Sequence, residues 1–215
     1  MEEEDDWNSG NERALSTSRW TIVRGIYSYK WSSFPGEALP DIIRIEDIET
    51  DPIGIVRKKE KPICALDDQS RKRIPEDLKK HLVEEGDVLV TLTGPPFKCA
   101  VVDSTSAGLV ISENIAAIRL EKERDAAPPE YIALYLNSPW GQKDLLTYAT
   151  GAAHLRKITP DKLSRLTIPC PTPETQDAYD FVRAYYRHEK LRMEEQEVRT
   201  RLMTGILQKI FGRRR

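Results

Sequence analysis

The 215-residue sequence is long enough for one medium-sized domain with an appendage, or for two small domains. Its 39% hydrophobic and 32% charged residues predict a folded core under a heavily solvated surface, and three widely spaced cysteines argue against a zinc site or a disulfide framework. The formal net charge of −2 excludes a uniformly basic nucleic-acid binder, and no apolar run approaches a membrane span. With an acidic N-terminus unlike a signal peptide, the sequence predicts a cytoplasmic protein.

The charge is strongly segregated along the chain. Residues 1–13 hold six acidic residues against one arginine and few apolar residues, which is typical of a disordered tail. Residues 56–73 hold seven bases against three acids, and residues 154–165 hold four against one. Each basic segment is either a solvated loop or a patch for an anionic partner, and charge alone does not decide between them.

The residues between the tail and position 120 predict a small, mostly antiparallel sheet. Aromatic and β-branched residues between 20 and 29 indicate a strand or a short helix. A proline followed by acids and then bases predicts a short helix over 75–83. Short runs rich in β-branched residues, separated by turn residues, predict the other strands. These strands are 42–45, 88–93, 100–102 and 116–120.

The remainder of the chain is predicted to be mainly helical. Apolar residues at spacings of three and four, after a proline pair, predict a helix over 128–136, and a second helix over 140–148 follows a break at Asn137-Ser138-Pro139. A short strand over 166–169 leads into the proline-rich segment 169–173, which we interpret as a linker.

Residues 174–211 predict one long helix or a helical hairpin, since they contain no proline and one glycine. A continuous helix of this length would extend for about 54 Å, too far for so small a domain to cover one face. We therefore expect a partner helix to cover its apolar residues. The residues predicted to lie in this interface are Tyr185, Leu191, Val198, Leu202, Ile206 and Ile210.

Several short runs from Gly86 onward occur in a specific order. They are Gly86-Asp87-Val88-Leu89-Val90-Thr91 with Thr93-Gly94, then Pro129-Glu130-Tyr131-Ile132, then Thr150-Gly151, and finally Ile168-Pro169-Cys170-Pro171-Thr172-Pro173-Glu174-Thr175-Gln176. In this order and spacing the sequence resembles the specificity subunits of type I restriction-modification systems.

The resemblance implies an α+β fold, in which a small, mostly antiparallel sheet with helices forms a target-recognition domain and a long coiled-coil-type helix follows. The expected parts are an acidic disordered tail (1–18), the recognition domain (19–173), the dimerisation helix (174–211) and a basic tail (212–215). A full-length family member has two recognition domains, each followed by a long helix, and the helices pack antiparallel as a spacer. This chain looks like a half subunit, so we expect a homodimer.

The resemblance also implies sequence-specific recognition of double-stranded DNA, with a methyltransferase subunit and a restriction or translocase subunit as partners. Lysine and arginine on loops supply phosphate contacts, and a few polar side chains read base edges. Each candidate taken singly is also consistent with an ordinary exposed basic side chain. The candidates are Arg57, Lys58, Lys59, Lys61, Arg71, Lys72, Arg73, Lys98, His154, Arg156 and Lys157.

The sequence contains no complete catalytic motif, so we expect no catalytic centre, no cofactor and no metal. Asn137-Ser138-Pro139-Trp140 departs at its second position from the motif of amino-methyltransferases, and helix breaking explains it better. His81, His154 and His188 do not lie at the spacing of metal ligands. Neither a phosphate-binding glycine loop nor a nucleophile elbow is present in the sequence.

Two other interpretations remain open. The chain could be a coiled-coil adaptor or regulatory protein of a phage-defence system that keeps the fold without reading DNA. It could also be a detached recognition domain of a larger modification enzyme, which predicts monomers or a different helix partner. Neutralising the lysines and arginines between 57 and 73 should abolish specific DNA binding if the chain is a DNA-recognition subunit. It should change nothing if the chain is an adaptor.

Overall fold

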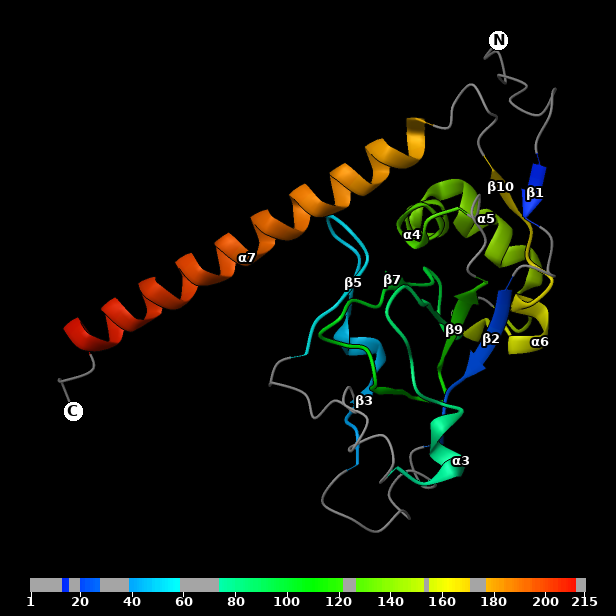
Figure 1. Cartoon of the computed structure of the whole chain (residues 1–215), viewed down its shortest axis with the longest axis horizontal. Coiled ribbons are helices and arrows are strands. Elements are labelled where there is room, and N and C mark those ends of the chain that lie inside the picture. The colour runs from blue at the N-terminus through cyan, green and yellow to red at the C-terminus, as the bar shows by residue number, and fades with distance from the viewer. Residues whose placement is uncertain are drawn as a thin grey trace.

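The computed structural model describes residues 13–15, 20–27, 39–58, 74–121, 127–152, 155–170 and 177–211. A domain of strands and short helices is followed by one long helix, and the predicted α+β class is confirmed (Figure 1). The candidates Lys59, Lys61, His154 and the run 71–73 lie outside the described residues, as do most of both predicted tails.

The central sheet has six strands and is almost entirely antiparallel. Its order is β2-β9-β6-β7-β5-β4, and only the β5–β7 pair is parallel. A separate parallel pair joins β3 to β8, and an antiparallel pair joins β1 to β10. The strands are β1 (Arg13–Leu15), β2 (Trp20–Arg24), β3 (Ile42–Ile43), β4 (Ile48–Glu49), β5 (Ile55–Val56), β6 (Val88–Thr91), β7 (Cys99–Val101), β8 (Val110–Ile111), β9 (Ile115–Leu120) and β10 (Ile168–Cys170).

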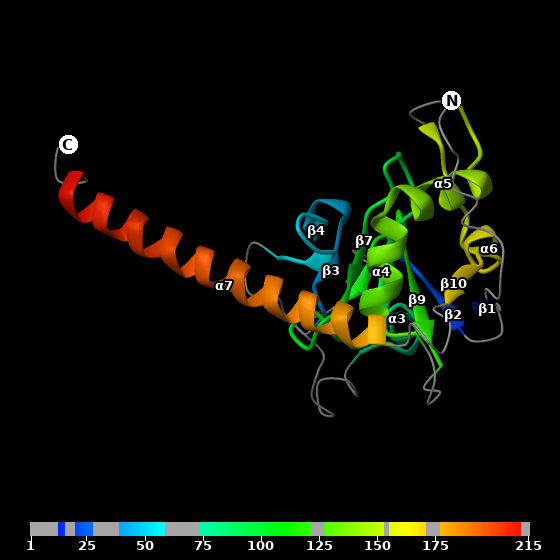
Figure 2. The same ribbon diagram turned by 90° about the horizontal axis from the view of Figure 1, so that it is seen from above.

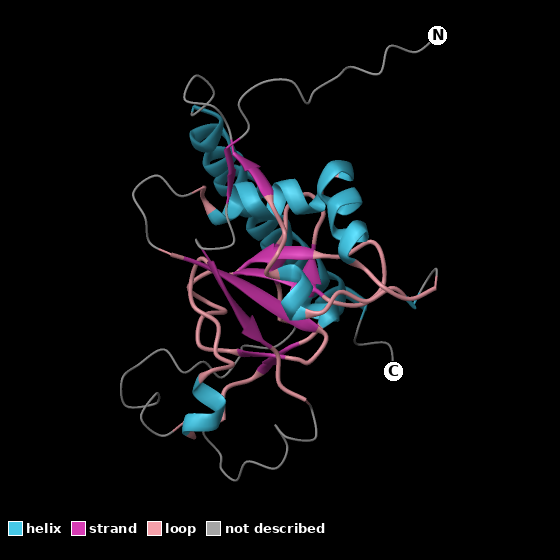
Figure 3. Ribbon diagram, turned by 90° about the vertical axis from the view of Figure 1, so that its right-hand side faces the viewer, coloured by secondary structure: helices cyan, strands magenta, loops and turns pink. Residues whose placement is uncertain are grey.

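Strand β6 lies at the centre of the sheet, and both of its faces are buried. Val88 and Val90 belong to the core cluster under the helices, whereas Leu89 belongs to the cluster on the opposite face. This alternation follows from the two-residue period of a strand and explains the continuous apolar run in the sequence. Figure 3 shows the strands as a layer with most of the helical segments on one side.

Helices α4 (Pro129–Asn137) and α5 (Pro139–Tyr148) cover the first of these faces, and α4 packs directly on β6 and β7 (Figure 2). The predicted break between them is confirmed: the Ser138 hydroxyl accepts a hydrogen bond from the Gly141 amide and caps α5. A side chain at Gly141 would place its Cβ 2.1 Å from the Tyr135 carbonyl oxygen, so this close approach requires glycine. The remaining short helices are η2 (Ile45–Asp47), α3 (Glu76–Lys79) and α6 (Pro160–Leu163).

Two predicted boundaries are wrong. The helix expected over 75–83 ends early, because the Val83 amide bonds to the Leu109 carbonyl and Leu82 forms a β-bridge with Val110. The tail expected to be disordered as far as residue 18 contains β1, whose main chain pairs with β10. In both places pairing with a distant strand outweighs the local composition.

Helix α7 (Asp177–Phe211) is continuous over 35 residues, so the hairpin alternative is excluded. At about 1.5 Å per residue it extends for roughly 52 Å. Its first turns pack against α4, where the Tyr131 and Tyr179 rings meet edge to face at 5.2 Å, and the rest extends away from the domain (Figures 1 and 2). Among the described helices, none is long and apolar enough to cross a membrane.

Candidate nucleic-acid interface

Two loop segments, residues 93–98 and the described residues 149–152 and 155–157, are joined to each other by main-chain hydrogen bonds. The Gly94 amide donates to the Arg156 carbonyl over 3.1 Å, and Thr150 and Lys157 exchange main-chain hydrogen bonds of 2.8 and 2.9 Å. Gly151 has a φ of 111°, and a Cβ there would lie 2.7 Å from the Leu155 carbonyl oxygen. These bonds and the glycine conformation hold the two loops as one unit, which we call the loop pair.

Two side-chain amides fix the base of the loop pair. Asn137 accepts from the Cys99 amide over 3.0 Å and donates to the Cys99 carbonyl over 2.8 Å. Gln142 makes the same two-way contact with Phe97, with distances of 2.8 and 2.7 Å. Asn137 therefore has a structural role, in agreement with the rejection of a methyltransferase motif, whereas sequence reasoning missed Gln142 altogether.

Arg156 and Lys157 are the predicted DNA-contacting residues that the structure leaves free. Lys157 is exposed and Arg156 is half-buried on the loop pair. Within the part of the chain that the structure describes, neither side chain has an ion-pair partner. The adjacent Leu155 is 76% exposed, so two basic side chains and an exposed apolar side chain follow one another on the loop pair.

The ammonium groups of Lys58 and Lys98, by contrast, bind acceptor groups within the domain. Lys58 Nζ donates to the Ile42 carbonyl over 2.8 Å and pairs with Asp47 at 3.2 Å and Asp41 at 3.3 Å. Lys98 Nζ donates to the Ile48 carbonyl over 2.9 Å. Both lysines hold the segment 41–48 in place, a function that charge patterning could not reveal.

Arg57 connects the recognition domain to α7. Its guanidinium lies 3.3 Å from Glu49 in β4 and 3.9 Å from Glu197 in α7. The basic segment 56–73 begins at this junction. The residues of the segment that follow Lys58 are outside the described ranges. Any contact made by that segment would therefore start beside the long helix.

A half-buried ion pair joins β9 to the turn before β6. The Arg119 guanidinium donates to both Asp87 carboxylate oxygens, over 3.0 and 2.8 Å, and also pairs with Glu84 at 3.0 Å. Burial raises the pKa of Asp87 above its ordinary value although Arg119 opposes this. The hydrogen bond to Asp87 raises the pKa of Arg119. Asp87 belongs to the run that carried the family resemblance, and its role is to connect β9 to the turn before β6.

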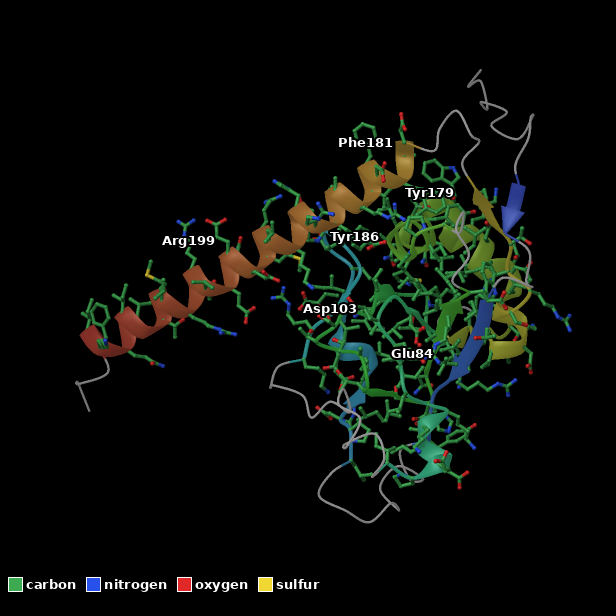
Figure 4. The ribbon with its side chains drawn as sticks, viewed as in Figure 1. Glu84, Asp103, Tyr179, Phe181, Tyr186 and Arg199 are labelled. Carbon is green, nitrogen blue, oxygen red and sulfur yellow. The ribbon has the colours of Figure 1, made fainter. Side chains whose placement is uncertain are left out.

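The predicted interface residues of α7 form an exposed apolar surface. They are 42–64% exposed, whereas Tyr179, Tyr186 and Glu189 on the other side of the helix are buried. Figure 4 shows Tyr179 and Tyr186 directed toward the domain and Phe181 directed away from it. The exposed residues are Tyr185, Leu191, Val198, Leu202, Ile206 and Ile210.

Solved structures with the same fold are type I restriction-modification proteins. The S subunit of a type I restriction-modification system from M. genitalium aligns over 95% of this chain with a TM-score of 0.55 and 14% identity. A chain from a structure described for the complex assembly and conformational transition of the type I R-M system aligns over 94% with a TM-score of 0.50 and 18% identity. This chain spans 47% of the length of each. No protein-family model and no curated protein sequence matches it.

The fold expected from the sequence resemblance is therefore confirmed: the chain has the fold of a recognition domain and long helix of a type I S subunit, and it corresponds to about half of such a subunit.

Proposed function

We propose that this chain is a non-catalytic DNA-recognition module of a type I restriction-modification complex. The observation that carries the proposal is the fold likeness to the M. genitalium S subunit, which covers 95% of the chain. In this function the domain reads double-stranded DNA, and a methyltransferase subunit performs the chemistry. A restriction or translocase subunit completes the assembly.

The loop pair and the basic segment 56–73 are the proposed DNA-contacting surfaces. Lysine and arginine side chains on loops provide contacts to DNA phosphates. A rigid framework keeps neighbouring side chains in register with the edges of the nucleotide bases. Arg156 and Lys157 satisfy both conditions, because their side chains have no ion-pair partner among the described residues and their main chain is bonded to Gly94 and Thr150. Lys58 and Lys98 are assigned a positioning role instead.

Pairing of two copies through α7 is part of the proposed function. The exposed apolar residues of α7 would stay in water in a monomer, and a helix with such a surface is stabilised by burying it. A second copy supplies a second recognition domain, so the pair would read a bipartite site with one domain at each half.

Binding of duplex DNA tests the recognition step. The preferred site is first selected from random duplexes with the wild-type protein, and affinity is then measured across a series of salt concentrations. Replacing Arg156 and Lys157 by alanine should weaken binding and reduce the slope of log K against log salt by about two, because each lost phosphate contact removes about one unit.

A matched control removes two basic side chains from the same basic segment, 154–165, but away from the loop pair. The variant with Lys162→Ala and Arg165→Ala loses the same charge and should keep most of the salt slope. Equal effects of the two variants would contradict the placement of DNA at the loop pair. Absence of selected binding by the wild-type protein, alone and with its methyltransferase subunit, would favour the adaptor.

A further inference from the structure

Leu155 is an exposed apolar residue on a loop that already has an anchor in the core. Three residues further on, Ile158 is 2% exposed and lies in the main core cluster, and its amide donates to the Leu92 carbonyl over 2.9 Å. Leu155 itself is 76% exposed, and among the described residues only Phe181 of α7 is an equally exposed large hydrophobic residue. The fold therefore gains little from a leucine at this position.

The main chain that carries Leu155 is held on both sides. The Leu155 amide donates to the Ala152 carbonyl over 2.8 Å. The Lys157 amide donates to the Thr150 carbonyl, also over 2.8 Å. The chain passes so close to Gly151 that a Cβ there would lie 2.7 Å from the Leu155 carbonyl oxygen. A side chain on a fixed main chain loses less conformational freedom when it binds, so Leu155 is preorganised for a contact.

The charge beside Leu155 favours a nucleic acid as the surface that it contacts. Arg156 and Lys157 follow Leu155 directly, and neither has an ion-pair partner in the described part of the chain. Basic side chains that bind phosphates position a protein on the duplex, whereas sequence is read at the edges of the base pairs. A neighbouring side chain without charge is therefore available for contact with a base edge.

A leucine side chain can complement only one of the groups on these edges. It has no hydrogen-bond donor or acceptor, so it cannot satisfy the ring nitrogens, carbonyls and amino groups that line the two grooves. The C5-methyl group of thymine in the major groove is the apolar exception. Insertion of the leucine between stacked base pairs is the alternative, but it requires unstacking and bending of the duplex. Contact with the methyl group requires neither.

We propose that Leu155 is a specificity-determining residue that recognises the C5-methyl group of a thymine in the major groove, while Arg156 and Lys157 bind neighbouring phosphates. This inference rests on the proposed function and deepens it, because it names the chemical group that one residue reads. The preferred site should therefore contain a thymine at a fixed position.

Removal of one methyl group from the DNA tests the contact directly. In the duplex selected by the wild-type protein, each thymine is replaced in turn by deoxyuridine, which keeps the base pair and lacks only the C5-methyl group. At one thymine the affinity of the wild-type chain should fall by about fourfold, the value of one buried methyl group. Leu155→Ala should bind the thymine and deoxyuridine duplexes equally at that position, because the contact is already lost.

Leu134→Ala is the matched control, since Leu134 is an exposed leucine of α4 outside the loop pair. This variant should keep the discrimination against deoxyuridine. Urea unfolding of Leu155→Ala should match that of the wild-type chain, because Leu155 lies outside the core clusters. If Leu155→Ala weakens the binding of every duplex equally and keeps the discrimination, the residue has only a structural role and the inference is overturned.

Fluorescence of 2-aminopurine, placed in turn at the adenines of the selected site, separates methyl recognition from insertion. It should stay quenched when the wild-type chain binds, whereas a rise that depends on Leu155 would reveal unstacking and overturn the methyl contact.

The outcomes also separate this inference from the proposed function. Binding of the selected duplex without any thymine that is sensed through Leu155 overturns the inference and leaves the proposed function intact. Absence of selected binding by the wild-type chain, alone and with its methyltransferase subunit, overturns both.

Discussion

The two halves of α7 have the same secondary structure but different surroundings. Up to Met193 one face of the helix belongs to the core of its own domain, with Tyr179 and Tyr186 buried against it. Beyond that point the apolar residues are exposed, and the Arg57–Glu197 pair is the last ion pair to the domain among the described residues. The first half is therefore stabilised by the fold, whereas the second half would be stabilised by the pairing in the proposed function.

This contrast separates folding from assembly within one helix. Substitutions in the first half should lower the free energy of unfolding at any protein concentration. Substitutions in the second half should change the dissociation constant of the pair and leave the domain folded. Three predictions test this separation, in order of decreasing effect.

Leu202→Ala should have the largest effect, and it should act on assembly. Each leucine that loses its interface contact costs about 2 kcal/mol, and the symmetric pair loses two, so the dissociation constant should rise by on the order of a thousandfold. Sedimentation equilibrium measures this constant. Leu155→Ala, at a leucine on the loop pair that is 76% exposed against 64% for Leu202, is the control, and equal weakening by both variants would argue against a specific helix interface.

Tyr186→Ala should act on folding instead. Tyr186 is 7% exposed and lies in the main core cluster, so its truncation should lower the free energy of unfolding by about 3 kcal/mol. Urea unfolding at two protein concentrations measures this loss. Tyr185→Ala is the neighbouring control, because Tyr185 is largely exposed, and it should cost far less. A loss for Tyr186→Ala that disappears in dilute protein would contradict the division of the helix.

The Lys190–Asp103 pair should have the smallest effect, because it spans the junction at the surface. Its atoms lie 2.5 Å apart. Burial raises the pKa of Asp103, but the hydrogen bonds from Lys190 and Thr105 outweigh it and hold the pKa below its ordinary value. The stabilisation from this carboxylate is therefore present above the ordinary carboxyl pKa and is lost as pH falls through the lowered value.

Lys190→Met removes the cation and keeps most of the side-chain length. It should raise the pKa of Asp103 and reduce stability at neutral pH by about 0.5 kcal/mol, since both groups are partly exposed. Titration of the Asp103 carboxyl followed by NMR measures the change, and Lys80→Met is the control. An unchanged Asp103 pKa would show that the pair does not form in solution.

The fold class, the long helix and most strands could be predicted from the sequence, because their patterns are local. The alternation in β6 and the helical period in α7 follow from a few neighbouring residues. The early end of the helix after Pro75 and the N-terminal strand could not be predicted, since both depend on main-chain partners far away in sequence.

The candidate interface was harder to predict than the fold. An exposed lysine on a loop and a lysine whose ammonium group holds a turn look the same in sequence, as Lys157 and Lys58 demonstrate. Sequence reasoning also assigned no role to Gln142, because a single amide has no pattern of its own. Its partner Phe97 lies 45 residues away in the sequence.

The amide contacts of Asn137 and Gln142 have a consequence for how specificity can change. Both side chains bond to main-chain groups of Phe97 and Cys99, and Gln142 also donates to the Leu136 carbonyl, so the bonds do not depend on which side chains the neighbouring loop carries. Substitutions in the loop can then accumulate without loss of its anchoring. Under the proposed function, exchange of a few loop residues would give a new target sequence while the scaffold stays the same.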